Sequence, residues 1–285
     1  MTTIALALAR AVRLGADGRG RFEAGPELQS WPGIVHGGGL VAALDEAALR
    51  LGAGKGARRI EARLTSSVPA GPSVALEGYA REGMAGVSLL DDGQPLTTAT
   101  VSALGPEDGS GAPAWAGGTA GWPLPMSEQC LACGAANPLG LQVRLAFDDD
   151  GVWARLTPRE SWRAAGALHP ALAPVALDEV AWWLGALVMK EGGLTNRISV
   201  ALLDPGAPVD GEVVAAGRFE EVAPVDRRRT FWRTAVTLGA GDGRLLARAA
   251  IVFRGGPEYS ARQLDYFQPR TAPGVFRRMF PNYAR

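Results

Sequence analysis

Apolar and polar residues alternate over two long stretches of the chain, residues 57–104 and 194–255. Successive side chains of a β-strand point to opposite faces, so a period of two is typical of strands with one buried face. Pro, Gly and Asp-Gly pairs interrupt both stretches, and the segments LLDDGQPL and GAGDGRLL near their ends have the composition of tight hairpin turns. Each stretch is therefore expected to form roughly four antiparallel strands.

A helical periodicity precedes each of these stretches. In the first segment the apolar residues form one face of a helix of about four turns; they are Leu40, Val41, Leu44, Ala48 and Leu51. In the second they surround the helix almost completely, which predicts deeper burial; they are Val175, Val180, Trp182, Trp183, Leu184 and Leu187. Asp178 and Glu179 lie in the middle of this second surface, where a carboxylate costs free energy unless it is paired.

The two helical segments carry the same signature. His36 and His169, the only two histidines of the chain, are each followed after eight residues by Asp-Glu. The two copies are 133 residues apart, and the strand patterns that follow them also match. A period of this length indicates a duplicated domain rather than a solenoid of short repeats. One helix packed on one antiparallel sheet in each copy gives an α+β fold.

These patterns divide the chain into four parts. Residues 1–104 are expected to form the first domain and residues 128–255 the second. Residues 105–127 between them are rich in Gly, Pro and Ala, which indicates a linker, and its two tryptophans are expected to pack along the surface. Residues 256–285 form a C-terminal tail with aromatic and basic residues.

The bulk composition narrows the class of protein. Apolar residues make up 47% of the chain, enough for a sizeable core, and 29 basic residues balance 29 acidic ones. This balance gives no reason to expect nucleic acid or an anionic membrane as a partner. No stretch approaches the roughly 20 apolar residues of a membrane-spanning helix, and the amino-terminal segment lacks the features of a signal peptide. We therefore expect a soluble, cytoplasmic protein.

Two cysteines, Cys130 and Cys133, form a single CLAC motif. A zinc site needs about four ligands, and the two histidines lie far along the chain within the repeated signature. No thioredoxin-like strand-to-helix context surrounds the pair, which argues against a redox dithiol. The sequence therefore predicts two reduced thiols in a turn and no metal.

Three glycines, Gly37 to Gly39, open the first helix. Backbone N–H groups at a helix start, with no side chains in the way, can bind an oxyanion or a polarised carbonyl. The segment GIVHGGGLVAALDEA resembles the central helix of hotdog-fold acyl-CoA thioesterases, in the branch that includes the phenylacetate-pathway thioesterases. The segment CLACGAANPLGLQVRLAF resembles the opening of single-domain members of that branch. The resemblance covers residues 22–255 and leaves the tail uncovered.

The resemblance implies two tandem hotdog units, each a long helix wrapped by an antiparallel sheet, fused into one chain with the active sites between them. It implies an acyl thioester of coenzyme A or of a carrier protein as substrate, and no cofactor besides that coenzyme A. The helix Asp would act as general base or nucleophile, and the first Gly N–H after the His would polarise the thioester carbonyl. A homodimer of the fused chain is a further expectation.

Helix geometry decides which groups can share a site. Gly37 and Asp45 are eight residues apart on one helix, a rise of about 12 Å, so they cannot both contact one reacting group. Each site must combine the start of one helix with the Asp of the other. Within the resemblance, a hydroxyl residue on the strand after the helix assists the Asp. The first site is then expected to consist of His36, Gly37, Gly38, Asp178 and Thr195.

The second site is expected to have decayed. Pro170 stands where the first copy has Gly37, and proline has no N–H to donate. Arg59 aligns with the hydroxyl position and would neutralise Asp45. We therefore expect one live site, in which His36 shapes the loop before the helix rather than transferring protons.

Two other functions stay open on the same scaffold, because a fold does not fix a function. The first alternative is a non-catalytic protein that binds acyl-CoA or a small acyl ligand. The second is a hydratase or dehydratase, which needs a His together with a carboxylate. It ranks last because each His lies about 12 Å from its own Asp.

The tail carries six aromatic residues, and aromatic side chains at this density are rarely left in water. It is expected to act as a strap over the edge of a sheet. The alternative is a lid, with Arg277 and Arg278 binding the phosphates of coenzyme A.

Overall fold

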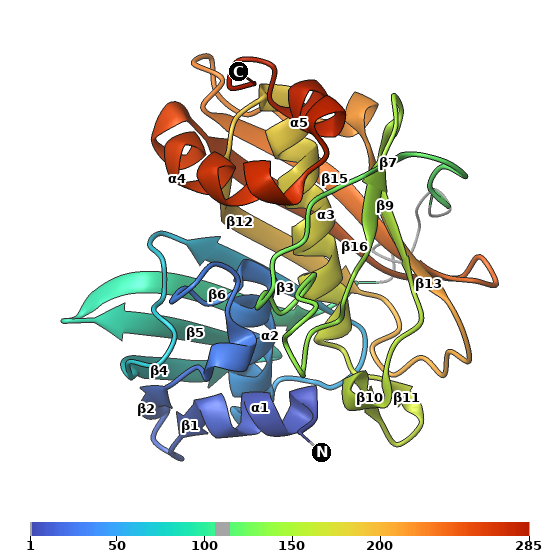
Figure 1. The fold of residues 1–285 in the computed structure, drawn as a ribbon. Helices are drawn as coiled ribbons and strands as arrows, with labels where there is room; N and C mark the ends of the chain where they lie inside the picture. The colour runs from blue at the N-terminus through green and yellow to red at the C-terminus, as the bar shows by residue number, and fades with distance from the viewer. Residues whose placement is uncertain (1, 106–114, 285) are drawn as a thin grey trace.

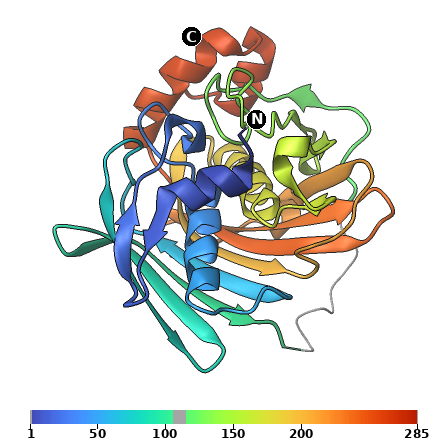
Figure 2. The same ribbon diagram turned by 90° about the horizontal axis from the view of Figure 1, so that it is seen from below.

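The computed structural model describes residues 2–105 and 115–284. The predicted linker, residues 105–127, is therefore described from residue 115 onward, and residues 106–114 lie outside the described residues. A single 14-stranded antiparallel sheet runs through both halves of the chain (Figure 1). Two long helices lie together on its concave side (Figure 2).

The first half contains the predicted helix followed by four strands. The helix is α2 (Gly37–Arg50), and the strands are β3 (Arg58–Leu64), β4 (Val74–Arg81), β5 (Met84–Asp91) and β6 (Gln94–Ala103). Shorter elements precede them: α1 (Ile4–Ala11), β1 (Val12–Leu14), β2 (Arg19–Phe22) and the 3-10 helix η1 (Pro26–Leu28). The hairpin β5–β6 turns at Asp92 and Gly93, both with positive φ, as the Asp-Gly signal predicts.

The second half repeats this arrangement. Its helix is α3 (Leu172–Met189), and its main strands are β12 (Gly193–Leu202), β13 (Val213–Arg218), β15 (Phe231–Ala240) and β16 (Leu245–Gly255). Before the helix come β7 (Trp122–Pro123), β8 (Leu145–Phe147), β9 (Gly151–Leu156), η3 (Glu160–Trp162), β10 (Arg163–Ala164) and β11 (Ala167–Leu168). Between β13 and β15 lie η4 (Phe219–Glu221) and β14 (Ala223–Pro224).

The two halves meet where β3 pairs antiparallel with β12, from Arg63 opposite Arg197 to Arg58 opposite Leu202. Outward from this seam the strand order is β3-β6-β5-β4-β2 on one side and β12-β16-β15-β13-β9 on the other. Equivalent strands therefore occupy equivalent places, which confirms the expected tandem α+β units, each a helix wrapped by an antiparallel sheet.

Helix α3 forms the centre of the core. Its apolar residues face α2 and the strands of its own half, and 78% of the helix is buried inside the protein. Among the described residues, α3 is the one helix long and apolar enough to cross a membrane by length and composition. Core helices pass the same test, and the near-continuous burial of α3 is what its all-round apolar pattern predicts.

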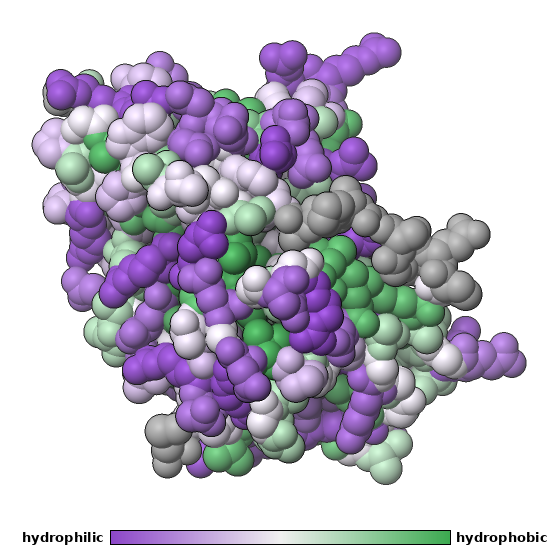
Figure 3. All heavy atoms as spheres, turned by 90° about the vertical axis from the view of Figure 1, so that its right-hand side faces the viewer, coloured by the Kyte–Doolittle hydropathy of each residue, from purple (hydrophilic) through white to green (hydrophobic). Residues whose placement is uncertain are grey.

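The described part of the linker and the tail both pack on the domains. Trp115 lies 5.8 Å from Trp153 and Trp122 lies 5.5 Å from Phe147, measured between ring centroids, as expected for a linker that follows the surface. On the side of the molecule that carries β7 and β9, apolar side chains lie between polar ones (Figure 3). The tail forms α4 (Pro257–Phe267), η5 (Gln268–Arg270) and α5 (Pro273–Met279), shown in red in Figure 1.

Candidate active site

A cavity of about 130 Å³ opens between the amino end of α2 and the middle of α3. Both halves of the chain contribute to its wall, because α2 belongs to the first unit and α3 to the second. The residues expected to form the first site lie on or beside this wall: His36, Gly37, Asp178 and Thr195 line it, and Gly38 follows on the helix. The fold therefore brings together groups that are up to 159 residues apart in the sequence.

Asp178 binds the amino end of the opposite helix. Its Oδ2 accepts a hydrogen bond of 2.8 Å from the backbone N–H of Gly38. Its Oδ1 accepts a hydrogen bond of 2.7 Å from the Thr195 hydroxyl. The structure therefore shows the cross-pairing that the helix rise required, and it places Thr195 beside this carboxylate as expected.

The backbone N–H of Gly37, next to Gly38, is free to bind a ligand. The N–H of Gly37 makes no hydrogen bond to any residue within 2–105 or 115–284, and Gly37 lines the cavity. A Cβ at position 37 would come within 2.6 Å of the Asp178 Oδ2, and one at position 38 would lie 2.2 Å from the carbonyl oxygen of Pro174. The close approach of the two helix backbones therefore requires glycine at position 38, and a side chain at position 37 would displace the Asp178 carboxylate.

The environment of Asp178 makes its carboxylate more basic than an exposed one. Burial raises its pKa above the usual value, while the charge of His36 and the hydrogen bonds from Thr195 and Gly38 oppose this shift. A buried carboxylate with a raised pKa is a better base than an exposed one. The arrangement can therefore take up a proton from a nucleophile next to a free N–H donor.

His36 has more partners than the sequence indicated. It is the N-cap of α2, and its Nδ1 lies 3.4 Å from the Gly39 N–H and 3.5 Å from the Asp178 Oδ2. On the other side of the ring, Nε2 lies 3.3 Å from the Glu179 Oε2. Burial lowers the pKa of His36, but the Cys130 thiol and the two carboxylates outweigh burial and hold the pKa well above its usual value.

This contact corrects one step of the sequence argument. The helix rise places each His about 12 Å from the Asp of its own helix, but His36 meets Asp178 of the other helix at 3.5 Å. The distance along one helix therefore does not exclude a His–Asp pair, because the pair forms between the two units.

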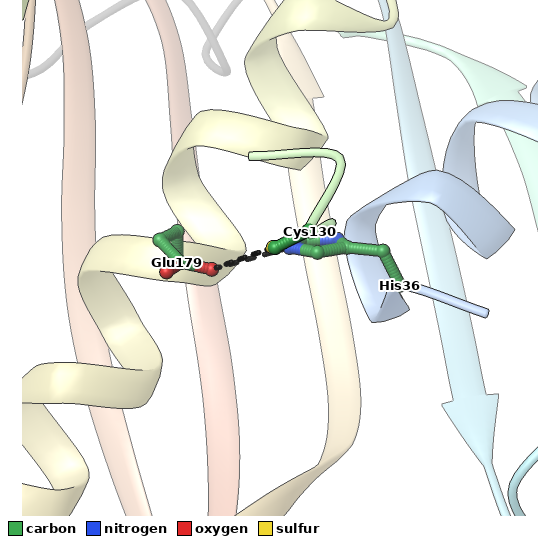
Figure 4. A group of neighbouring side chains, drawn as sticks. All are labelled: His36, Cys130 and Glu179. Atoms are coloured by element: carbon green, nitrogen blue, oxygen red, sulfur yellow. Dashed lines mark hydrogen bonds and ion pairs between the residues drawn. The ribbon is translucent and has the colours of Figure 1, made fainter. Parts of the chain in front are cut away.

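Cys130 joins the same group of side chains (Figure 4). The side chains of His36, Cys130 and Glu179 each place a polar atom within 4.8 Å of the other two. As noted from the sequence, the histidines lie far from the cysteines along the chain, but in the fold His36 lies next to Cys130, because separation along the chain does not measure separation in space. The CLAC motif is the one feature of the sequence that could have pointed to this cluster.

The two thiols differ in their electrostatic environment. Burial and the charge of Glu179 raise the pKa of Cys130, but the hydrogen bond from Cys133 and the interactions with His36 outweigh them and lower the pKa to about 7. The pKa of Cys133 is raised well above its usual value by its hydrogen bond to Cys130 and by burial. Both cysteines are reduced and line the cavity.

The second expected site is closed. The guanidinium of Arg58 donates from Nε to the Asp45 Oδ1 at 2.7 Å and from a second nitrogen to Oδ2 at 2.5 Å. Both side chains are buried. The partner is therefore Arg58 and not Arg59, since adjacent strand residues face opposite sides of the sheet and only Arg58 points inward. The alignment on the following proline was one residue out of register.

The start of α3 also differs from the start of α2. Pro170 precedes the helix, which begins at Leu172, and His169 accepts a hydrogen bond of 3.2 Å from the Ala171 N–H through its Nδ1. The space beside these residues has a volume of only about 20 Å³. The second site therefore lacks both an N–H donor at position 170 and room for a substrate.

Arg277 and Arg278 do not line the cavity. Arg278 forms an ion pair with Asp149 and lies over the ring of Trp122 at 3.7 Å from the centroid. The part of the tail that reaches the cavity is α4, through Tyr259 and Phe267. Phosphate binding by the two arginines stays a prediction.

Sequence reasoning missed an aromatic wall of the cavity. Phe267 packs against three tryptophans with ring centroids 5.0 to 5.9 Å apart; these are Trp31, Trp182 and Trp183. Arg254, at the end of β16, also lines the cavity. The periodicity of the sequence does not distinguish these aromatic residues and Arg254 from ordinary core and surface residues. The tail that packs over them occurs once in the chain, so the repeat gives no second copy to compare.

Comparisons with known proteins agree with this architecture. No family model matches the chain, and no curated protein matches it. Among solved structures, a predicted thioesterase II from Thermobifida fusca YX is 19% identical, with a TM-score of 0.63 over 90% of this chain and 100% of that chain. A conserved protein of unknown function with a hot dog fold from Alicyclobacillus acidocaldarius is 17% identical, with a TM-score of 0.58 over 88% and 98%.

A third similar structure belongs to a different class of enzyme. The dehydratase domain of RzxB from Pseudomonas fluorescens is 16% identical, with a TM-score of 0.55 over 83% of this chain and 94% of that chain. Sequence identities this low show only that the folds are similar, so the chemistry has to be inferred from the residues of the site. The topology and these likenesses together establish that the chain is a tandem hotdog-fold protein, with two units joined through one continuous sheet.

Proposed function

We propose that the protein hydrolyses an acyl thioester in the cavity between its two hotdog units. The observation that carries the proposal is the position of Asp178, whose carboxylate is fixed by Gly38 and Thr195 beside the free N–H of Gly37. The thioesterase II structure supports this reading at the level of fold. The acyl donor would be coenzyme A or a carrier protein.

The mechanism follows from these groups. The thioester carbonyl oxygen accepts a hydrogen bond from the Gly37 N–H, which stabilises the negative charge that develops on attack. Asp178 either removes a proton from the attacking water or attacks the carbonyl carbon itself through a carboxylate oxygen. Collapse of the tetrahedral intermediate breaks the carbon–sulfur bond. When water is the nucleophile, the proton taken up by Asp178 passes to the departing thiolate and the free acid is released. When Asp178 is the nucleophile, the acyl group stays on its carboxylate as a mixed anhydride while the thiolate takes a proton from water, and a second water then hydrolyses the anhydride and restores Asp178. The Thr195 hydroxyl holds the carboxylate in place throughout.

The cavity limits the acyl group. Its volume of about 130 Å³ is similar to that of an apolar cavity that accommodates benzene, about 150 Å³. Its wall includes the rings of Trp182, Trp183 and Phe267. We therefore propose a short or aromatic acyl group rather than a long fatty chain.

A panel of acyl-CoA thioesters tests the proposal, with the released thiol followed colorimetrically. Turnover of short or aromatic thioesters that disappears in Asp178→Asn supports it. Binding of the same compounds without turnover, by calorimetry, would favour the acyl-binding protein instead.

A dehydratase or hydratase is the second candidate, and the structure provides a specific reason for it. His36 and Asp178 belong to opposite units and lie 3.5 Å apart, and a dehydratase domain is among the similar folds. The same wild-type protein, incubated with a 3-hydroxyacyl thioester, would then form the 2-enoyl thioester without releasing thiol. Product analysis by mass spectrometry separates the two reactions.

A further inference from the structure

Three segments that are remote in sequence converge on one corner of the cavity. His36 is the N-cap of α2, Cys130 lies in the loop before β8, and Glu179 lies in the middle of α3. Figure 4 shows the three side chains pointing toward one another. Hydrolysis by Asp178 uses neither Cys130 nor Glu179.

The spacing of the three polar atoms matches a metal site. Zinc bonds to nitrogen and oxygen of about 2.0–2.1 Å and to sulfur of about 2.3 Å require tetrahedral ligand atoms to lie about 3.3–3.6 Å apart. The His36 Nε2 lies 3.3 Å from the Glu179 Oε2, and the Cys130 Sγ lies 3.9 Å from the same oxygen. All three atoms lie within 4.8 Å of one another, so shifts of a few tenths of an ångström to about 1 Å complete the geometry.

We propose that His36, Cys130 and Glu179 bind a zinc ion, with a fourth coordination position that faces the cavity. Thiolate and imidazole ligands select zinc over calcium or magnesium, which prefer oxygen ligands alone. Three protein ligands and one open position are typical of zinc sites that exchange a water or a substrate group.

Neighbouring groups support this coordination. Coordination through Nε2 leaves the proton on Nδ1 of His36, which then donates to the Asp178 Oδ2 at 3.5 Å in place of accepting the long 3.4 Å contact from the Gly39 N–H. A carboxylate in this position orients a zinc-bound histidine. The backbone N–H of Ala132 lies 3.3 Å from the Cys130 Sγ and donates to it, which stabilises a thiolate.

Cys133 provides a matched control within the same motif. It lies in the same turn and is equally buried, but its sulfur is not part of the group of mutually close ligand atoms. It accepts a hydrogen bond of 3.4 Å from the Ser127 N–H and donates one to the Cys130 sulfur, a donor that Cys133→Ser retains. A loss of binding that is specific to Cys130 therefore reports on coordination and not on the presence of a buried thiol.

The experiment measures zinc directly and does not depend on thioesterase activity. The full chain is purified under reducing conditions, stripped with chelator, incubated with zinc chloride, desalted, and analysed for metal content and for the melting temperature. We expect about one zinc per chain and a higher melting temperature, because binding to the native state alone stabilises it. Cobalt substitution should give the absorption bands of a cobalt–thiolate bond.

The variants identify the ligands. Cys130→Ser and Glu179→Gln should weaken zinc binding by more than about 100-fold, which exceeds the usual effect of changing a residue that only hydrogen-bonds to a ligand. Cys133→Ser should retain zinc binding. Circular dichroism checks that each variant is folded. A wild-type protein that holds no zinc, or that forms a Cys130–Cys133 disulfide in its place, would overturn the proposal. Equal binding by Cys130→Ser and wild type would do the same, and loss in Cys133→Ser would rule out the open coordination position.

Discussion

The carboxylate of Asp178 and the backbone N–H of Gly38 are joined by a hydrogen bond of 2.8 Å across 140 residues of sequence. This contact connects the helix of one hotdog unit to the helix start of the other. The first site therefore exists only when the two units are packed together, because neither unit contains both groups.

The asymmetry of the two sites predicts that only one of two matched variants loses activity. Asp178→Asn should reduce the hydrolytic rate by about 100- to 10,000-fold, the usual contribution of a base or nucleophile. Asp45→Asn should leave the rate per folded molecule nearly unchanged, because Asp45 is occupied by Arg58 in a closed site. Initial rates on the best thioester make the comparison. An inactive Asp45→Asn beside an active Asp178→Asn would reverse the assignment.

Asp45→Asn should instead affect stability. The variant leaves the Arg58 guanidinium, which is 2% exposed, without a charged partner. Breaking a buried ion pair from one side typically costs about 3–5 kcal/mol, and chemical denaturation measures the loss. The double variant Asp45→Asn with Arg58→Met should recover part of it; no recovery would show that the charge is not the cause.

Thr195 should act on the rate through Asp178. Thr195→Val keeps the shape of the side chain and removes the hydrogen bond of 2.7 Å to Oδ1. We expect kcat to fall by about tenfold, the value of one lost hydrogen bond to a charged group, with little change in KM. Thr195→Ser retains the hydroxyl and should retain most of the activity. A Ser variant as slow as the Val variant would contradict a role for the hydroxyl.

The stability of the fold should depend on the protonation of His169. Burial, together with the charge of Arg58, lowers the pKa of His169 to about 4 in the folded state, against 6.5 for the free side chain. The unfolded chain therefore takes up this proton first as the pH falls. The contribution to stability is complete above about pH 6.5 and is lost between pH 6.5 and 4, by at most about 3–4 kcal/mol.

The test compares urea denaturation of the wild type and His169→Asn at several pH values. Asn can still accept the hydrogen bond from the Ala171 N–H, and it does not titrate. The difference in unfolding free energy between the two proteins should change across this window and be flat above it. A difference that does not vary with pH would show that His169 is not the group responsible.

Arg254 is the better placed cation for the phosphates of a coenzyme A substrate. Arg254 lines the cavity, where it also pairs with the exposed Glu258 at 3.9 Å. Arg278 does not line the cavity and instead contacts Asp149 and Trp122. Arg254→Ala should raise KM for acyl-CoA by about tenfold and should not affect a short thioester that lacks the nucleotide. If Arg278→Ala or Arg277→Ala raises KM and Arg254→Ala does not, the assignment made from the sequence is the right one.

Removing residues 256–285 should destabilise the protein. The tail buries Phe267, Phe276 and Phe280, of which Phe280 is fully buried. Their loss should lower the melting temperature by about 10 °C and increase the binding of a hydrophobic dye. An unchanged melting temperature with a loss of coenzyme A affinity alone would support a lid instead of a strap.

Much of this site could be predicted from the sequence. The period of the apolar residues indicated which segments are helices and strands, and the repeat indicated two equivalent units. The fixed rise of an α-helix then excluded Gly37 and Asp45 from one site, which left Asp178 as the partner of the first helix start. These inferences succeed because each depends on local geometry that the backbone imposes on any sequence.

Other features were decided by the tertiary structure alone. Whether Arg58 or Arg59 meets Asp45 depends on strand register, and one residue of register moves a side chain to the other face of the sheet. That Cys130 meets His36 and Glu179 depends on how a loop is packed between two helices, and sequence separation carries no information about such a contact. The amino acid sequence determined the two units and the cross-pairing of their helices, and tertiary packing decided which side chains share the space between them.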